Sequence, residues 1–184
     1  MFILTEKPSV AKEFAHALGG FTYHKGYYSN ANDCITHAVG HVLSLFDPED
    51  YDISLKKWDM HNLPIIPSNM QYKEIGETKD QLKIIAQCFK NFDSSDFILA
   101  TDAEREGEFI GALILDYVGF KNYKTARRFW VSSALTKEVI LNGIKNAKPL
   151  SEYEMYKKAG YARQQADWLT GINITRLLSI KANT

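Results

Sequence analysis

Apolar and polar positions alternate along this chain in blocks that predict an α/β fold. Short apolar runs at Phe2–Leu4 and Phe97–Ala100 end at polar residues, which is typical of buried strands. Further strands are expected within 23–39 and 126–131, and helices over 8–18, 78–92, 109–118 and 136–145. Strands that alternate with helices in this way indicate a largely parallel central sheet flanked by helices.

A break at Pro149 separates this block from a last helical segment. Ser151 and Glu154 have the spacing of a capping box, so we expect a new helix to begin there and to bend near 171–173. Its pattern is still running at Thr184. We therefore expect an α/β domain over 1–148, the beginning of a helical domain over 149–184, and a chain cut from a longer protein.

Composition narrows the class of protein. Hydrophobic residues make up 45% of the 184, enough for a packed core, so a disordered chain is not expected. Lys+Arg and Asp+Glu both number 22, so a nucleic-acid partner would need a local basic surface. Neither a signal peptide nor a membrane span is evident, and the two cysteines have no metal-ligand spacing. Together these features predict a cytoplasmic location and no membrane partner.

Four carboxylates follow the strand that ends near Leu99: Asp102, Glu104, Glu106 and Glu108. Acidic groups crowded at a strand end raise each other's pKa unless a cation joins them. Carboxylate oxygens are ligands that Mg²⁺ accepts. The run therefore indicates a magnesium site at the carboxyl edge of the sheet.

This acidic run has three other interpretations. A solvated acidic surface is about as common from composition alone. A calcium-binding loop fails, because Leu113 stands where such a loop needs a bidentate glutamate. Acidic residues also favour a helix N-terminus without any metal, which would explain Glu106 and Glu108 but not the two acids before them.

Other polar residues follow neighbouring strands. Glu6 and Lys7 come directly after the first strand, where open α/β sheets place their ligands, although a solvated pair in a loop is an alternative. His41 could contact a phosphate or a carboxylate there, or be satisfied by nearby backbone. Either Arg127 or Arg128 could pair with the acidic run or with a phosphate.

The last segment mixes positive, amide and aromatic side chains, including Lys157, Arg163, Gln164 and Trp168. Such a helix suits a groove for single-stranded nucleic acid. An amphipathic helix that docks on a neighbouring element fits the spacing equally well.

Six motifs, in this order, resemble the amino-terminal part of type IA DNA topoisomerases, and most closely the topoisomerase III branch. They are Thr5-Glu6-Lys7-Pro8-Ser9-Val10-Ala11, Val39-Gly40-His41-Val42-Leu43, Leu63-Pro64-Ile65-Ile66-Pro67, Ala100-Thr101-Asp102-Ala103-Glu104-Arg105-Glu106-Gly107-Glu108, Arg128-Phe129-Trp130-Val131-Ser132-Ser133 and Ala162-Arg163-Gln164-Gln165-Ala166-Asp167-Trp168-Leu169. The resemblance implies a Toprim fold followed by part of a helical domain that holds single-stranded DNA. It also implies ATP-independent cleavage of one strand, strand passage and religation.

The resemblance also implies roles for individual residues. Glu6 matches a glutamate that protonates the leaving 3′ oxygen, and Lys7 a lysine that stabilises the scissile phosphate. Mg²⁺ would be held by Asp102, Glu104 and Glu106, although the family has aspartate where this chain has Glu104. Arg163 and Asp167 match residues placed near the DNA in the helical domain, and Arg128 and Arg176 are further candidate DNA contacts.

The family's nucleophile is a tyrosine beside a Tyr-Pro-Arg-type motif, and none of the five prolines here precedes an arginine. We therefore expect no nucleophile in this chain, no activity from it alone, and partnership with the remaining domains of the same topoisomerase. Two other hypotheses stay open: a self-sufficient Toprim nuclease or primase, and a non-catalytic DNA-binding module.

Overall fold

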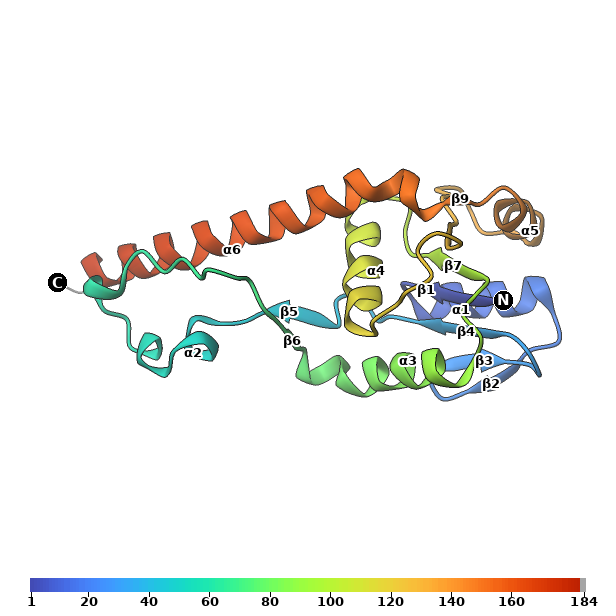
Figure 1. The fold of residues 1–184 in the computed structure, drawn as a ribbon, viewed down its shortest axis with the longest axis horizontal. Helices are drawn as coiled ribbons and strands as arrows, with labels where there is room; N and C mark the ends of the chain where they lie inside the picture. Colours follow the sequence, from blue (N-terminus) through green and yellow to red (C-terminus); the bar gives the residue numbers. More distant parts are fainter. Residues whose placement is uncertain (183–184) are drawn as a thin grey trace. The chain divides into compact units, whose positions relative to one another are not determined.

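The computed structural model describes residues 1–182 and contains a seven-stranded sheet (Figure 1). Its strand order is β2-β3-β4-β1-β7-β8-β9. The bounds are β1 Phe2–Thr5, β2 Thr22–His24, β3 Tyr27–Ser29, β4 Cys34–His37, β7 Phe97–Ala100, β8 Arg127–Arg128 and β9 Lys148–Pro149. The four central strands are parallel, and the pairs at both edges are antiparallel. The predicted largely parallel sheet is confirmed.

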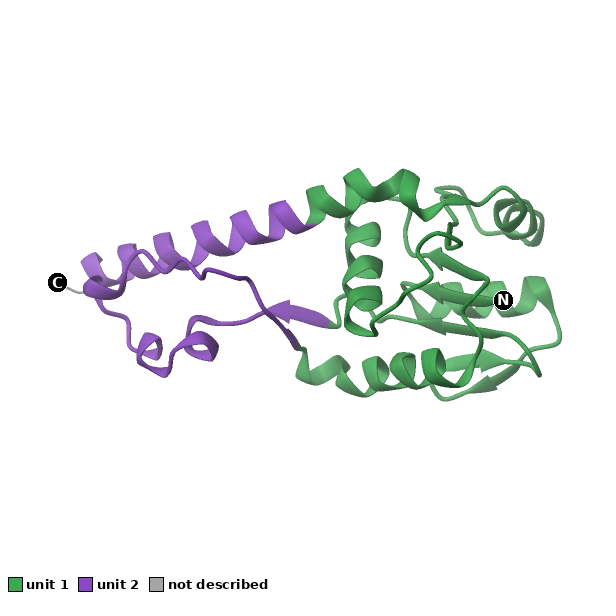
Figure 2. Ribbon diagram, viewed as in Figure 1, with its two compact units in different colours: residues 1–42, 74–160 green, residues 43–73, 161–184 purple. Residues whose placement is uncertain are grey.

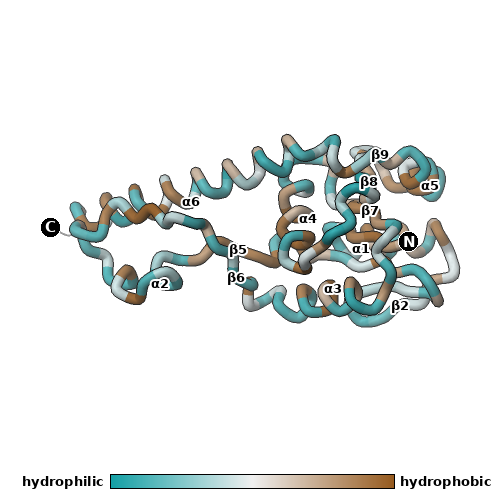
Figure 3. The backbone as a smooth tube through the Cα atoms, in the orientation of Figure 1, coloured by the Kyte–Doolittle hydropathy of each residue, from teal (hydrophilic) through white to brown (hydrophobic). Residues whose placement is uncertain are grey.

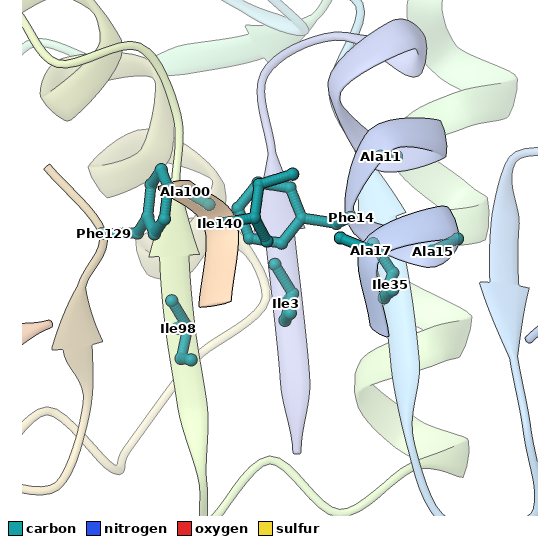
Figure 4. Packing of buried hydrophobic residues seen from close by; sticks show 10 residues of the cluster. All are labelled: Ile3, Ala11, Phe14, Ala15, Ala17, Ile35, Ile98, Ala100, Phe129 and Ile140. Carbon is teal, nitrogen blue, oxygen red and sulfur yellow. The ribbon is translucent and has the colours of Figure 1, made fainter. Parts of the chain in front are cut away.

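Four helices flank the sheet: α1 Pro8–Leu18, α3 Lys79–Asn91, α4 Arg105–Tyr117 and α5 Lys137–Lys145. Alternate side chains of each strand point to opposite faces. Ile3, Ile35 and Ile98 therefore share one face, where they pack with Phe14 of α1 and Ile140 of α5 (Figure 4).

The opposite face carries the larger side chains of the same strands. Phe2 lies with its ring centroid 4.3 Å from that of Phe89 on α3. A β-carbon on Gly111 would meet the Leu99 side chain at 2.7 Å, so α4 packs closely on β7. Every residue of α4 from 107 to 115 is buried, in keeping with its largely hydrophobic colouring in Figure 3.

Three predicted element boundaries were wrong. α4 begins at Arg105 instead of 109, so Glu106 and Glu108 belong to its first turn. β8 contains only Arg127–Arg128 instead of the expected 126–131. The last hydrogen bond to β7 runs from the Phe129 amide to the Leu99 carbonyl, and the strand does not continue beyond it. No capping box forms at Ser151, whose carbonyl instead accepts a bond from the Glu154 amide and closes a 3-10 turn over Leu150–Tyr153. Helix α6 then runs without a break from Glu154 to Ala182.

The chain divides into two compact units, coloured separately in Figure 2. Unit 1 contains residues 1–42 and 74–160, and unit 2 contains 43–73 and 161–184. The single division expected near Pro149 does not describe this grouping, because residues 43–73 join the last helical segment. Among residues 1–182, no helix combines the length and the hydrophobicity needed to cross a membrane.

Unit 2 contains short elements held against α6 by long-range hydrogen bonds. These elements are β5 Leu43–Leu45, α2 Pro48–Tyr51, 3-10 turns at Ile53–Lys56 and Met60–Asn62, and β6 Tyr72–Glu74, which pairs with β5 and ends at the border with unit 1. Asn173 accepts from the Ile65 amide at 2.6 Å and donates to the Ile65 carbonyl at 2.9 Å. Trp168 donates from Nε1 to the Phe46 carbonyl at 2.9 Å.

Candidate functional site

The acidic loop, residues 101–104, links the end of β7 to the start of α4. Glu104 occupies the N-cap position of α4 in an extended conformation. A β-carbon on Gly107 would lie 2.3 Å from the Asp102 carbonyl oxygen and 2.8 Å from its amide nitrogen. Only glycine permits this approach, so Gly107 lets the first turn of α4 pack against the backbone of Asp102.

The parallel register brings Glu6 and Lys7 to the same edge of the sheet as this loop. Thr5 of β1 pairs with Ala100 of β7, so the residues that follow them are neighbours. The Asp102 amide donates to Glu6 Oε2 at 3.1 Å, and Lys7 Nζ donates to Asp102 Oδ2 at 2.6 Å. The structure thus brings together three of the predicted site residues.

Burial and neighbouring charges perturb this group. Glu6 is 8% exposed, and burial raises its pKa above the ordinary value of 4.5. The negative charges of Asp102 and Glu104 add to this effect, while the Asp102 amide and Lys7 oppose it. The pKa of Lys7 is raised by its hydrogen bond and charge interaction with Asp102. A buried acid that holds its proton more tightly than usual is suited to general acid chemistry.

Glu106 has a different partner. His41 follows β4, and its Nε2 lies 2.7 Å from Glu106 Oε1 in the first turn of α4. Both side chains are partly exposed, at 39% and 48%. Of the alternatives that the sequence left open for His41, the structure shows the contact with a carboxylate of this site.

The donor chemistry of the acidic loop fits a hard divalent cation, but the ligands are not gathered around one point. Asp102 is paired with Lys7, and Glu106 with His41. Within residues 1–182, no three acidic, histidine or cysteine side chains form a cluster that could hold a metal ion. Because both ion pairs are exposed, they are weak enough for a cation or a phosphate to displace them.

Arg128 is buried beneath the acidic loop and binds its backbone carbonyls. Its side chain is fully buried, and its Nε donates to Glu108 Oε2 at 2.6 Å. Its terminal nitrogens donate to the carbonyls of Leu99, Thr101 and Asp102 at 3.2, 2.9 and 2.8 Å. Arg128 therefore pairs with the acidic run and fixes the loop, and its burial leaves no surface for the DNA contact expected of it.

A cavity of about 360 Å³ opens beside the acidic loop. Thr101, Asp102 and Glu104 line it together with Ser132 and Ser133, which follow β8. The Thr101 hydroxyl is buried and has no hydrogen-bond partner among the described residues. Neither serine was predicted to belong to the site, although both follow the strand expected at 126–131, which was the available signal.

The remaining site candidates lie in unit 2. Arg163 and Asp167 form an exposed pair on α6, with Nε and Oδ2 3.4 Å apart. Arg176 is 5% exposed, donates to the Leu55 carbonyl at 2.5 Å and lies 3.8 Å from Glu49 Oε2. Two of these three side chains are therefore open to solvent, and Arg176 is largely enclosed.

The chain is similar to known proteins both in sequence and in fold. The chain is 45% identical to DNA topoisomerase 3 of Staphylococcus aureus strain USA300 over 179 residues, and 44% identical to the putative DNA topoisomerase 3 of strain bovine RF122. Each match covers 97% of this chain and 25% of the relative, so the chain spans about a quarter of those proteins. The full-length topoisomerase I of Thermotoga maritima has a similar fold, with a TM-score of 0.60 at 20% identity over 92% of this chain and 24% of that one.

A family profile described as the Toprim domain matches residues 2–134. These residues contain the central strands, the acidic loop and most of the residues that line the cavity beside it. They account for most of the chain. The chain belongs to the Toprim domain family.

Proposed function

We propose that this chain works within a type IA DNA topoisomerase, in which it supplies the general acid and the magnesium ligands. The observation that carries the proposal is that two hydrogen bonds link Glu6, Asp102 and Lys7 at one edge of the sheet. The Asp102 amide lies 3.1 Å from Glu6 Oε2, and Lys7 Nζ lies 2.6 Å from Asp102 Oδ2. The similarity to relatives named DNA topoisomerase 3 supports it.

Each residue has a defined role in this proposal. Glu6 donates a proton to the leaving 3′ oxygen on cleavage and takes it back on religation, which its raised pKa favours. Lys7 moves from Asp102 to the scissile phosphate and stabilises its charge. Asp102, Glu104 and Glu106 would hold Mg²⁺, which when bound supplies charge stabilisation to the phosphate oxygens.

Single-stranded DNA is the proposed substrate. Arg163 and Asp167 are exposed enough on α6 to contact it. Arg176, which is largely enclosed, would contact DNA only at its edge, and Arg128 would act by holding the acidic loop. The nucleophilic tyrosine would come from the remaining domains of the same protein. A cytoplasmic setting belongs to the proposal too, and the free thiols of Cys34 and Cys88 support it.

A chimeric protein tests the proposal. This chain would replace the matching 179 residues of the S. aureus DNA topoisomerase 3, and relaxation of supercoiled DNA would be measured with and without Mg²⁺. We expect Mg²⁺-dependent relaxation without ATP, its loss in Glu6→Gln and Asp102→Asn, and its retention in the exposed control Glu152→Gln.

A folded chimera that does not relax DNA, while the parent protein does, would contradict the proposal. The 184-residue chain alone should show no cleavage or relaxation. Magnesium-dependent nuclease activity from the chain alone, lost in Asp102→Asn, would instead favour a self-sufficient Toprim nuclease.

A further inference from the structure

A second cavity in unit 1 lies apart from the acidic loop. It has a volume of about 280 Å³, at the lower end of the range for ligand pockets. Ala112 and Leu115 of α4 and Leu150 form apolar walls, and Glu108, Glu154 and Lys157 supply charge. It shares no lining residue with the cavity beside the acidic loop.

Glu108 places a buried carboxylate in this cavity. Its side chain is only 3% exposed, and its Oε2 accepts a hydrogen bond from Arg128 Nε. Among the described residues, Glu108 makes no hydrogen bond through Oε1, which leaves that atom for a donor inside the cavity. A carboxylate oxygen with little access to water gains strongly from a charged donor.

The cations near the cavity already have acidic partners. Lys157 Nζ lies 3.2 Å from Asp116 Oδ1 and 5.1 Å from the centre of the Tyr123 ring. Lys158 lies 3.9 Å from Glu154 in an exposed pair, which water screens. The carboxylates of Glu108 and Glu154 therefore line this apolar space. Lys157 is the one cation among the lining residues, and its charge is already balanced by Asp116. Burial raises the pKa of Glu108 above its ordinary value, the charges of Arg128 and Lys157 oppose this rise, and the charge of Glu154 adds to it.

We propose that this cavity binds a small organic monocation, an amidinium or ammonium group attached to an aryl or short alkyl body. The charged end bonds Glu108 Oε1 and approaches Glu154, while the body packs on Ala112, Leu115 and Leu150. Arg128 joins Glu108 to the carbonyls of Thr101 and Asp102, so an occupant of this cavity also acts on the acidic loop.

Titration of the 184-residue chain with benzamidine tests the proposal, with neutral benzamide as the matched ligand. The readout is the methyl NMR resonances of Ala112, Leu115 and Leu150. We expect benzamidine to saturate these shifts with a dissociation constant on the order of 1 mM, and benzamide to bind at least tenfold more weakly. Equal binding of the two ligands, or no shift up to about 20 mM benzamidine, would overturn it.

Two variants locate the charge. Glu154→Gln should weaken benzamidine binding about two- to fivefold, whereas Glu152→Gln, which removes an equally exposed carboxylate outside the cavity, should leave it unchanged. Equal effects of the two would refute the assignment. Ala112→Leu should abolish binding by filling the cavity. If this variant does not fold, the comparison of Glu154→Gln with Glu152→Gln still decides, because both side chains are exposed and their substitution should not disturb folding.

Discussion

The Arg128 guanidinium and the Glu108 carboxylate form a buried ion pair, with Nε and Oε2 2.6 Å apart and side chains 0% and 3% exposed. The pair joins β8 to the first turn of α4. Through its remaining nitrogens, Arg128 also holds the carbonyls of Thr101 and Asp102. The position of the acidic loop therefore depends on an arginine that solvent does not reach.

Arg128→Met should lower the free energy of unfolding by about 3–5 kcal/mol, because it leaves Glu108 charged and unpaired in the interior. Urea denaturation measures this loss. Arg127→Met is the control, since Arg127 pairs with Asp96 at the surface, and it should cost about 1 kcal/mol or less. If the two variants lost equal stability, the buried pair would not have the role assigned to it.

The core of unit 1 could be predicted from the sequence because its signals are local. Phe2–Leu4 and Phe97–Ala100 are short apolar runs with polar ends, and Gly19 follows the helix that begins at Pro8. Glu6 and Asp102 could be brought together by topology alone, since parallel strands end at one edge.

The remaining features depend on contacts distant in sequence. An arginine is usually expected at the surface, and the burial of Arg128 follows from Glu108 and three carbonyls that only the fold assembles. Asn173 holds Ile65 across 108 residues, so the grouping of 43–73 with α6 had no local signal. The helix was expected only from 109, and the start of α4 at Arg105 was indicated only by the alternative in which Glu106 and Glu108 favour a helix N-terminus, since an acidic first turn has the polarity of a loop.

Glu6 should make stability depend on pH. Its pKa is raised in the folded chain, so its contribution is fully present below the ordinary value of 4.5 and is lost as the pH rises through the folded value. Glu6→Gln removes this loss. The variant should therefore gain stability relative to the parent as the pH rises from 4.5 to 8, measured by thermal unfolding across that range. Glu13→Gln, at an exposed position on α1, should show no such trend.

Gly107→Ala should destabilise the chain by about 1–3 kcal/mol, because its β-carbon would overlap the Asp102 backbone. Gly171→Ala is the matched control: apart from the backbone of its own stretch of helix, no atom lies within 4 Å of its β-carbon position, and alanine favours a helix interior. That control should stabilise by up to about 1 kcal/mol. The free energy of unfolding of both variants is measured by chemical denaturation. If the two substitutions changed it in the same direction, the acidic loop would not be packed against α4.

Lys7→Ala should strengthen Mg²⁺ binding in the absence of DNA. Lys7 Nζ occupies Asp102 Oδ2 in an exposed pair, so a metal ion must displace it. Releasing an exposed pair of this kind should raise the affinity about two- to fivefold, which isothermal titration can resolve. Lys12→Ala, on the exposed side of α1, removes the same charge without touching Asp102 and should change the affinity less. Unchanged or weaker binding in Lys7→Ala would mean that Asp102 is not a ligand, or that Lys7 does not compete for it.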